Sequence, residues 1–173
     1  MEQCTSSSRV YDGRILNLRV DQLMLGNGKT AKREIIEHRG AAAIVPIIQD
    51  RDVVLVRQYR YAVATDLLEV PAGTMEQGET PEECAVRELE EETGYRCKEI
   101  EKILEFFPVP GYSTEKIHVY IAKGLSQSKM NTEDDEQISV EILPMENALE
   151  KVRSGEIHDA KSICALFRAA ELL

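Results

Sequence analysis

The sequence predicts an α/β fold in which a mixed β-sheet lies between helices, with a small antiparallel β-sheet ahead of it. Two observations lead to this prediction. Residues 9–39 contain short strand-like runs separated by glycine turns. From residue 40 onward, apolar runs of strand length alternate with segments of helical pattern, as in a layered domain. We therefore divide the 173 residues into an N-terminal sheet, 1–39, and a main domain, 40–173.

The N-terminal sheet is predicted from its turn signals. Asp12-Gly13 and Gly26-Asn27-Gly28 interrupt residues 9–39, and residues 15–25 between them alternate like a strand. The first nine residues lack the basic and apolar regions of a signal peptide. We expect a ragged terminus there.

The main domain is predicted to begin with a hairpin. The apolar runs 41–48 and 53–59 flank Gln49-Asp50-Arg51-Asp52, which has the composition of a turn. Further strands are expected at 67–70, 101–107, 117–122 and 138–143, and helices at 146–153, started by Pro144, and from Asp159 onward.

A helix with both ends marked is predicted between these strands. Thr80 has the residue type of an N-cap, Pro81 suits the first helical position, and Glu83 completes a capping box. Gly94 marks the C-terminal end. The helix therefore covers residues 81–93.

This helix holds six glutamates against one basic residue, Arg87. Glu88, Glu91 and Glu92 share a face, because they lie three and four residues apart. Like charges at these spacings destabilise a helix, so a partner outside the helix must neutralise them. A Glu-rich helix is otherwise a solvated surface. Carboxylates on one helical face suit a hard divalent cation such as Mg²⁺ or Mn²⁺.

The residues around this helix fit a longer pattern. It runs as Gly73, five residues, Glu79, seven residues, Arg87-Glu88-Leu89, one residue, Glu91-Glu92, one residue, and Gly94-Tyr95. The segment resembles the Nudix box. The resemblance implies a Nudix-type α/β/α sandwich and a hydrolase that cuts a nucleoside diphosphate linked to another moiety.

The same resemblance implies two or three Mg²⁺ ions per site, with Mn²⁺ as an alternative. The implied metal ligands are the carbonyl of Ala72 and the carboxylates of Glu88, Glu91, Glu92 and Glu136. Arg87 is expected to orient a neighbouring glutamate through a charge-assisted hydrogen bond. Gly73 is expected to let the backbone pass close to the metal. Arg87 and the four glutamates are the candidate catalytic residues.

Four flanking motifs are similar to the ADP-ribose diphosphatase branch of the Nudix family: RQYR at 57–60, LEVPAG at 68–73, PGYSTE at 110–115 and GEIHDAK at 155–161. The implied substrate-binding residues are Arg33, Arg57, Arg60, Glu69, Pro110, Gly111 and Glu115. Arg60 matches the phosphate-contacting arginine. Strand alternation places Arg57 on the opposite face, where it is equally compatible with a surface role. Glu69 is equally compatible with pairing to a nearby Lys or Arg, and Pro110-Gly111 with a simple turn.

The general base has two candidates. In the resembling branch, a glutamate on a loop between the late strands activates the water, and Glu136 matches that position. The chain has Asp134 where an earlier glutamate is common, which puts the role of Asp134 in doubt. Glu115 follows the substrate-selecting turn and is the second candidate.

The implied reaction is metal-dependent hydrolysis of ADP-ribose to AMP and ribose 5-phosphate. One alternative is another nucleotide-sugar specificity, such as GDP-mannose. The other is a non-catalytic ADP-ribose sensor on the same fold, although sensors tend to lose box glutamates and this chain keeps them.

Composition limits the partners. A net charge of −10 disfavours nucleic acid, and no apolar run approaches the ~18 residues of a membrane span. Because the first residues do not resemble a signal peptide, we expect a cytoplasmic protein. The four cysteines show no metal-ligand spacing and are expected to be reduced. By resemblance, we expect a homodimer in which the N-terminal sheet, with Lys32 and Arg33, completes the substrate site of the other subunit.

Overall fold

The computed structural model describes residues 2–49, 51–131 and 137–173. The chain divides into two compact units. The first comprises the residues up to Gly40 together with Phe107–Lys116, and the second comprises Ala41–Phe106 and Ile117–Leu173. The division after Gly40 lies beside the expected boundary. The return of Phe107–Lys116 to the first unit had no signal in the sequence.

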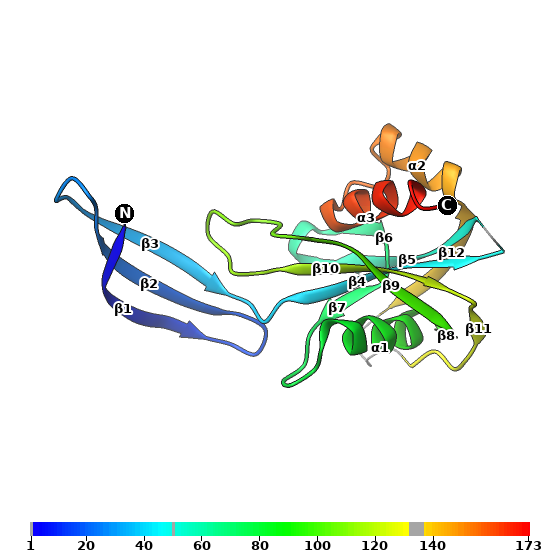
Figure 1. The fold of residues 1–173 in the computed structure, drawn as a ribbon, viewed down its shortest axis with the longest axis horizontal. Helices are drawn as coiled ribbons and strands as arrows, with labels where there is room; N and C mark the ends of the chain where they lie inside the picture. Colours follow the sequence, from blue (N-terminus) through cyan, green and yellow to red (C-terminus); the bar gives the residue numbers. More distant parts are fainter. Residues whose placement is uncertain (1, 50, 132–136) are drawn as a thin grey trace. The chain divides into compact units, whose positions relative to one another are not determined.

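The first unit is built on an antiparallel sheet in the order β1-β2-β3. Its strands are β1 (Gln3–Asp12), β2 (Asn17–Met24) and β3 (Thr30–Glu37) (Figure 1). The turns fall where the sequence predicts them. The N–H of Gly13 donates to the carbonyl of Leu16 at 3.1 Å, and Gly28 adopts a left-handed φ of 79°.

The expectation of a ragged N-terminus is wrong. β1 pairs with β2 from Gln3↔Met24 to Asp12↔Asn17, with two irregularities in register. Every residue of β1 is exposed, and its sequence lacks the alternation of apolar and polar residues that identifies a strand.

The segment that returns to this unit is held against β3 by backbone hydrogen bonds. The N–H of Ile36 donates to the carbonyl of Tyr112 at 2.7 Å, and the N–H of Thr114 donates to the carbonyl of Ile36 at 2.9 Å. Pro110 and Gly111 lie in the turn that precedes these contacts.

The second unit contains a seven-stranded sheet, in the order β12-β5-β4-β10-β9, with β6 paired to β5 and β7 paired to β4. The strands are β4 (Ala41–Ile48), β5 (Asp52–Arg60), β6 (Thr65–Glu69), β7 (Ala72–Thr74), β9 (Glu99–Phe106), β10 (Ile117–Lys123) and β12 (Ile138–Pro144). β4 and β10 are parallel and the other pairs are antiparallel. The sheet is therefore mixed, as the sequence predicts. A short 3₁₀ helix, η1 (Tyr61–Val63), follows β5, and a separate two-stranded ladder joins β8 (Tyr95–Arg96) to β11 (Ser126–Gln127).

The predicted hairpin of β4 and β5 is present but short. The two strands pair only at Ile47↔Val53 and Ile48↔Asp52 within the described residues. Beyond those pairs β4 joins β10 and β7, whereas β5 joins β12 and β6. Because β4 is almost wholly buried, it takes the central place in the sheet.

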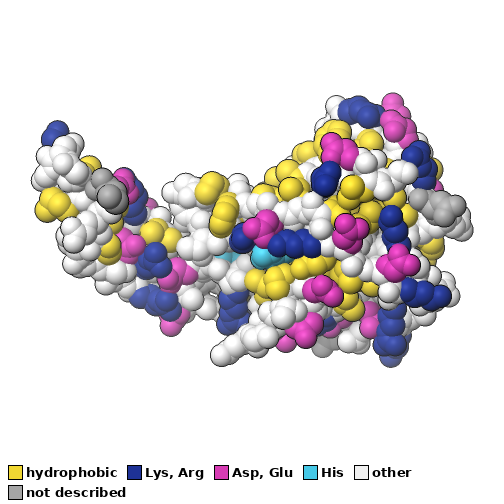
Figure 2. Space-filling model, viewed as in Figure 1, with side chains coloured by type: hydrophobic (Ala, Val, Ile, Leu, Met, Phe, Trp, Pro, Cys, Tyr) yellow, Lys and Arg dark blue, Asp and Glu magenta, His cyan; other side chains and the backbone are white. Residues whose placement is uncertain are grey.

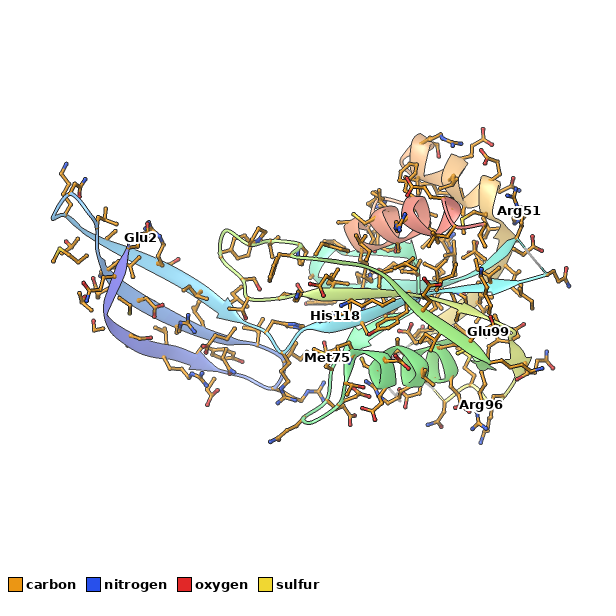
Figure 3. The ribbon with its side chains drawn as sticks, viewed as in Figure 1. Glu2, Arg51, Met75, Arg96, Glu99 and His118 are labelled. Atoms are coloured by element: carbon orange, nitrogen blue, oxygen red, sulfur yellow. The ribbon has the colours of Figure 1, made fainter. Side chains whose placement is uncertain are left out.

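Helices cover both faces of this sheet, giving the predicted sandwich (Figure 1). The helices are α1 (Pro81–Thr93), α2 (Met145–Ser154) and α3 (Ala160–Ala170). Alternate residues of β4 serve two cores: Ala43 and Val45 pack in the larger one with α2 and α3, while Ala42 and Ile44 pack in the smaller one under α1. Met75, which follows β7, packs against the smaller core (Figure 3).

The ends of α1 match their prediction. The hydroxyl of Thr80 accepts from the N–H of Glu83, whose carboxylate accepts from the N–H of Thr80 at 2.9 Å. Pro81 is the first helical residue, and Gly94 ends the helix with a left-handed φ of 70°. Local sequence thus fixes the start and end of the helix that carries the candidate site.

Candidate active site on helix α1

Arg87 organises the acidic face of α1. Its Nη1 donates to Oε1 of Glu88 at 2.7 Å and to Oε2 of Glu91 at 2.9 Å. Its Nε donates to Oε1 of Glu79 at 2.8 Å. The hydrogen bond that Arg87 donates to Glu79 and the charge of Glu88 raise the pKa of Arg87 further above its ordinary value, although desolvation opposes them. The arginine thus holds two of the candidate ligands in place, as expected of it.

Glu79 is a residue whose role sequence reasoning missed. It occupies a fixed position of the motif, but lies in the turn before α1 and not on the acidic face. Its carboxylate contacts both Nε and Nη2 of Arg87, at 2.8 and 3.1 Å. The Arg87 hydrogen bond lowers the pKa of Glu79, so this pair stays ionised. The contact spans eight residues and joins the turn to the helix.

The other side of this face lies against the backbone of β7. The N–H of Ala72 donates to Oε2 of Glu92 at 3.0 Å, and the Glu92 residue is 4% exposed. A Cβ on Gly73 would lie 1.8 Å from Oε1 of Glu88, which no real contact permits. The Glu88 carboxylate therefore occupies the space of a side chain at residue 73, and adding one would force that carboxylate to move. The structure brings four predicted residues, Ala72, Glu88, Glu91 and Glu92, to one place.

These donors fit a hard divalent cation. They are carboxylate oxygens and a neighbouring backbone segment, and the missing Cβ of Gly73 lets the Glu88 carboxylate lie against that backbone. Among the described residues, no group of three or more His, Cys, Asp or Glu side chains is arranged so that it could hold a metal ion. Arg87 engages the carboxylates of Glu88 and Glu91, and Ala72 engages that of Glu92. The remaining predicted ligand, Glu136, lies outside the described residues.

A second group of predicted residues meets at the ends of β5 and β6. Nε and Nη2 of Arg60 donate to the two oxygens of Glu69 at 2.9 and 2.8 Å. Lys161 also donates to Glu69, which is 1% exposed. Glu69 thus pairs with both an arginine and a lysine, which the sequence allows as the alternative to a role in substrate binding. Sequence reasoning did not single out Lys161, because it lies 92 residues away in the chain.

Arg57 lies on the other face of β5, as strand alternation predicts. Its Nε donates to Oε1 of Glu141 on β12 at 2.5 Å, and its Nη2 lies 3.9 Å from Glu156. The structure does not bring Arg57 together with Arg60, and its role in substrate binding stays a prediction.

The predicted substrate-binding residues Arg33, Pro110, Gly111 and Glu115 all belong to the first unit. Arg33 donates to Glu2 at 2.5 Å (Glu2 is marked in Figure 3). Oε1 of Glu115 lies 3.8 Å from Nδ1 of His38. Pro110 and Gly111 form the turn described above. Their contacts with substrate, and the choice of Glu115 as base, remain predictions.

A model of the NUDIX domain family matches residues 37–166 of this chain. The chain belongs to the Nudix family.

Relatives of this Nudix protein extend the likeness beyond the family motif. The chain is 38% identical to an ADP-ribose pyrophosphatase of Bacillus subtilis (strain 168) and 39% identical to a methanol dehydrogenase activator of Bacillus methanolicus; each match covers 95% of this chain and 90% of the relative. It is 40% identical to a GDP-mannose pyrophosphatase of Cronobacter sakazakii, over 78% of this chain and 75% of the relative.

A solved structure shares the fold of this Nudix protein. The crystal structure of an ADP compounds hydrolase superposes with a TM-score of 0.88 at 23% identity, covering 99% of this chain and 94% of that one. The family membership and the relatives establish the chain as a Nudix hydrolase. In the described part of the chain, no helix combines the length and the apolar character that crossing a membrane requires.

The Glu69 cluster predicts an acid-dependent loss of stability in this Nudix hydrolase. Burial alone raises the pKa of Glu69, but the hydrogen bond from Arg60 and the charge of Lys161 outweigh it and lower the pKa from 4.5 to about 2. A pKa lower in the folded than in the unfolded state stabilises the fold at higher pH, and this contribution is lost as pH falls from about 4.5 towards 2.

We therefore expect Glu69→Gln to destabilise the protein most at neutral pH. The difference between wild type and variant in the free energy of unfolding, measured with urea, should shrink as pH falls through that range. A difference independent of pH would contradict the assigned ion pairs.

Proposed function

We propose that this Nudix hydrolase is a metal-dependent ADP-ribose diphosphatase, which hydrolyses ADP-ribose to AMP and ribose 5-phosphate. The observation that carries the proposal is the extent of the likeness. Relatives named ADP-ribose pyrophosphatase align with 95% and 93% of this chain, in Bacillus subtilis and Mycobacterium tuberculosis, and so include residues far outside the family motif. The GDP-mannose pyrophosphatase of Cronobacter sakazakii aligns with 78%.

The site supports this chemistry through its residues. Bound Mg²⁺ or Mn²⁺, two or three ions per site, supplies positive charge against the diphosphate and lowers the pKa of the attacking water. Ala72, Glu88, Glu91, Glu92 and Glu136 hold the metal in this proposal. Arg87 keeps Glu88 and Glu91 oriented, and Arg60 binds a phosphate through its exposed side. Salt bridges to Glu69 hold the Arg60 side chain for this task.

A substrate panel tests the proposal. Steady-state kinetics with Mg²⁺ would compare ADP-ribose, GDP-mannose and other nucleoside diphosphate derivatives by kcat/KM. ADP-ribose should have the highest value, with AMP and ribose 5-phosphate as products. A higher value for GDP-mannose would replace the substrate while keeping the chemistry. Tight binding of ADP-ribose without turnover would instead identify a sensor.

Glu136→Gln should lower kcat far more than it changes KM if Glu136 activates the water, because such a group acts in the transition state. The expected loss of kcat is about 100-fold or more. Asp134→Asn, two residues away, is the matched control and should have a much smaller effect. Equal effects of the two variants would make Glu115 the better candidate for the base.

We also propose a homodimer formed through the first unit. All of β1 is exposed, and Val10, Tyr11 and Ile15 are 62%, 58% and 60% exposed. Val10 and Tyr11 lie on β1 and Ile15 lies in the turn that follows it, and exposed apolar side chains grouped in this way favour burial against another chain. Sedimentation of the intact protein should give twice 19.5 kDa.

The double change Val10→Ser and Ile15→Ser should shift the dimer towards the 19.5 kDa species. Phe167→Ser is the control, because Phe167 is 44% exposed on α3 of the second unit, and this change should leave the dimer intact. Finding the intact chain at 19.5 kDa at micromolar concentration would rule out the dimer.

Two further features support the remaining parts of the proposal. On the face shown in Figure 2, acidic and basic side chains are interspersed. The net charge of the chain is −10, so the protein repels a nucleic acid but can still bind a small anionic substrate. All four cysteines are free thiols, which fits the reducing cytoplasm.

A further inference from the structure

Of the GEIHDAK motif, Gly155–Lys161, the site described above includes Lys161, which donates to Glu69. The structure places the end of the motif at the start of α3, where Asp159 is the N-cap. Oδ2 of Asp159 accepts from the N–H of Ser162 at 3.0 Å and from its hydroxyl at 2.6 Å. The same oxygen accepts from Nζ of Lys161 at 3.0 Å. One carboxylate oxygen therefore orients two side chains.

Both of these side chains contact the end of β6. Nζ of Lys161 donates to Oε2 of Glu69, and the hydroxyl of Ser162 accepts from the N–H of Val70 at 2.9 Å. Glu69 and Val70 are each 1% exposed and Ser162 is 0% exposed, so water does not compete for these hydrogen bonds. The first turn of α3 thus holds two consecutive residues of the LEVPAG motif.

The next residues of that motif are fixed from other elements. The carbonyl of Pro71 accepts from the N–H of Ile44 on β4 at 2.9 Å, and the N–H of Ala72 donates to Glu92 on α1 at 3.0 Å. Residues 69–72 are therefore held in turn by α3, β4 and α1. The contacts of Lys161 and Ser162 form the first part of this support.

Lys161 also sets the charge balance around Arg60. Two cations, Arg60 and Lys161, face two carboxylates, Glu69 and Asp159. The hydrogen bond that Arg60 donates to Glu69 is the main cause of the raised pKa of Arg60, and the charge of Asp159 contributes to it. Without Lys161, the guanidinium would face both carboxylates alone and would be drawn from its present position.

That position leaves one side of the guanidinium available. Nε and Nη2 of Arg60 are engaged by Glu69, while Nη1 makes no hydrogen bond to any residue that the structure describes. The side chain of Arg60 is 38% exposed. We propose that Lys161, tied to Asp159, is a positioning residue that keeps Arg60 fixed on Glu69, so that the free side of its guanidinium faces the substrate diphosphate. This inference rests on the proposed function, because it requires a diphosphate substrate.

Four variants test the role of Lys161. Lys161→Met keeps most of the side chain but removes its charge, and should raise KM about tenfold with kcat little changed, as expected when binding of the substrate and of the transition state is weakened equally. Lys161→Gln should act in the same direction. Lys161→Arg keeps the charge and should retain most of the affinity. The double variant Lys161→Met with Asp159→Asn should recover much of the affinity for substrate, because it also removes the negative charge of Asp159 that Lys161 would otherwise balance.

Lys151→Met is the matched control. Lys151 forms an ion pair with Glu156 at 2.6 Å near the end of α2 and has a 31% exposed side chain, so its loss should leave KM unchanged. Kinetics would use the substrate that the wild type cleaves best. Calorimetric titration with a non-hydrolysable analogue, in which a methylene bridges the two phosphorus atoms, gives a Kd that should follow KM across the series.

The outcomes separate this inference from the proposed function. Preference of the wild type for another nucleoside diphosphate would overturn the ADP-ribose assignment, yet the Lys161 series would still be measured on that substrate. Wild-type KM and Kd in folded Lys161→Met would overturn the positioning role, even if its melting temperature fell. If that variant does not fold, Lys161→Gln and the double variant carry the same comparison.

Discussion

Glu92→Gln should reduce kcat on the order of 100-fold at saturating Mg²⁺, an effect comparable to the loss of one preorganised electrostatic group. Glu92 is a buried carboxylate, and one of its oxygens accepts from the N–H of Ala72 at 3.0 Å. Glutamine keeps the size and an acceptor oxygen for that bond but removes the charge that attracts the metal. Steady-state kinetics across a Mg²⁺ titration would measure the loss.

Glu82→Gln is the control for this experiment, because Glu82 is exposed in the first turn of the same helix. It should retain wild-type kcat and Mg²⁺ dependence. Thermal denaturation of both variants separates loss of chemistry from loss of fold. Near-normal turnover of Glu92→Gln at saturating Mg²⁺ would contradict the assignment of Glu92 as a metal ligand.

Gly73→Ala should lower kcat to a similar degree through displacement of Glu88. The added Cβ would lie 1.8 Å from Oε1 and 2.1 Å from Cδ of Glu88, so the carboxylate must move away from its place beside Arg87. Shifting a group at an active site by about 1 Å is enough to cost on the order of 100-fold in rate. The fold should persist, because the clash involves the end of a flexible side chain.

A double-mutant cycle tests this mechanism. If the alanine acts through Glu88, then Gly73→Ala should cause little further loss of kcat in a Glu88→Ala background. Additive losses would show that Gly73→Ala acts on the backbone of β7 instead. Melting temperatures of the four proteins in the cycle would show whether stability accounts for any of the difference.

The acidic helix illustrates what local sequence decides. The Thr80 and Glu83 cap, the Gly94 stop and the three- and four-residue spacing of the glutamates all act within one contiguous segment. Backbone geometry converts such spacing directly into a shared face, and the structure agrees. Arg87 was likewise expected to hold a neighbouring glutamate through a charge-assisted hydrogen bond, and it donates to Glu88.

Other features required partners that are distant in sequence. β1 carries no apolar alternation and exists through its pairing with β2, so its pattern could not reveal it. β4 and β5 separate after two residue pairs because β7 and β6 pair with the rest of the edges that these two strands would share. Segment 107–116 returns to β3 through backbone hydrogen bonds, which leave little trace in side-chain composition.

By itself, the sequence determined the family motif, the helix that bears it and the carboxylates that suit a divalent metal. Only the tertiary structure decided how Glu69 is neutralised, which side of β5 carries Arg60, and why Gly73 has no room for a side chain. The physical reason is distance along the chain. Helical periodicity and capping act over a few residues, whereas the partners of Glu69 and Gly73 lie up to 92 residues away and meet only when the sheet and its helices pack.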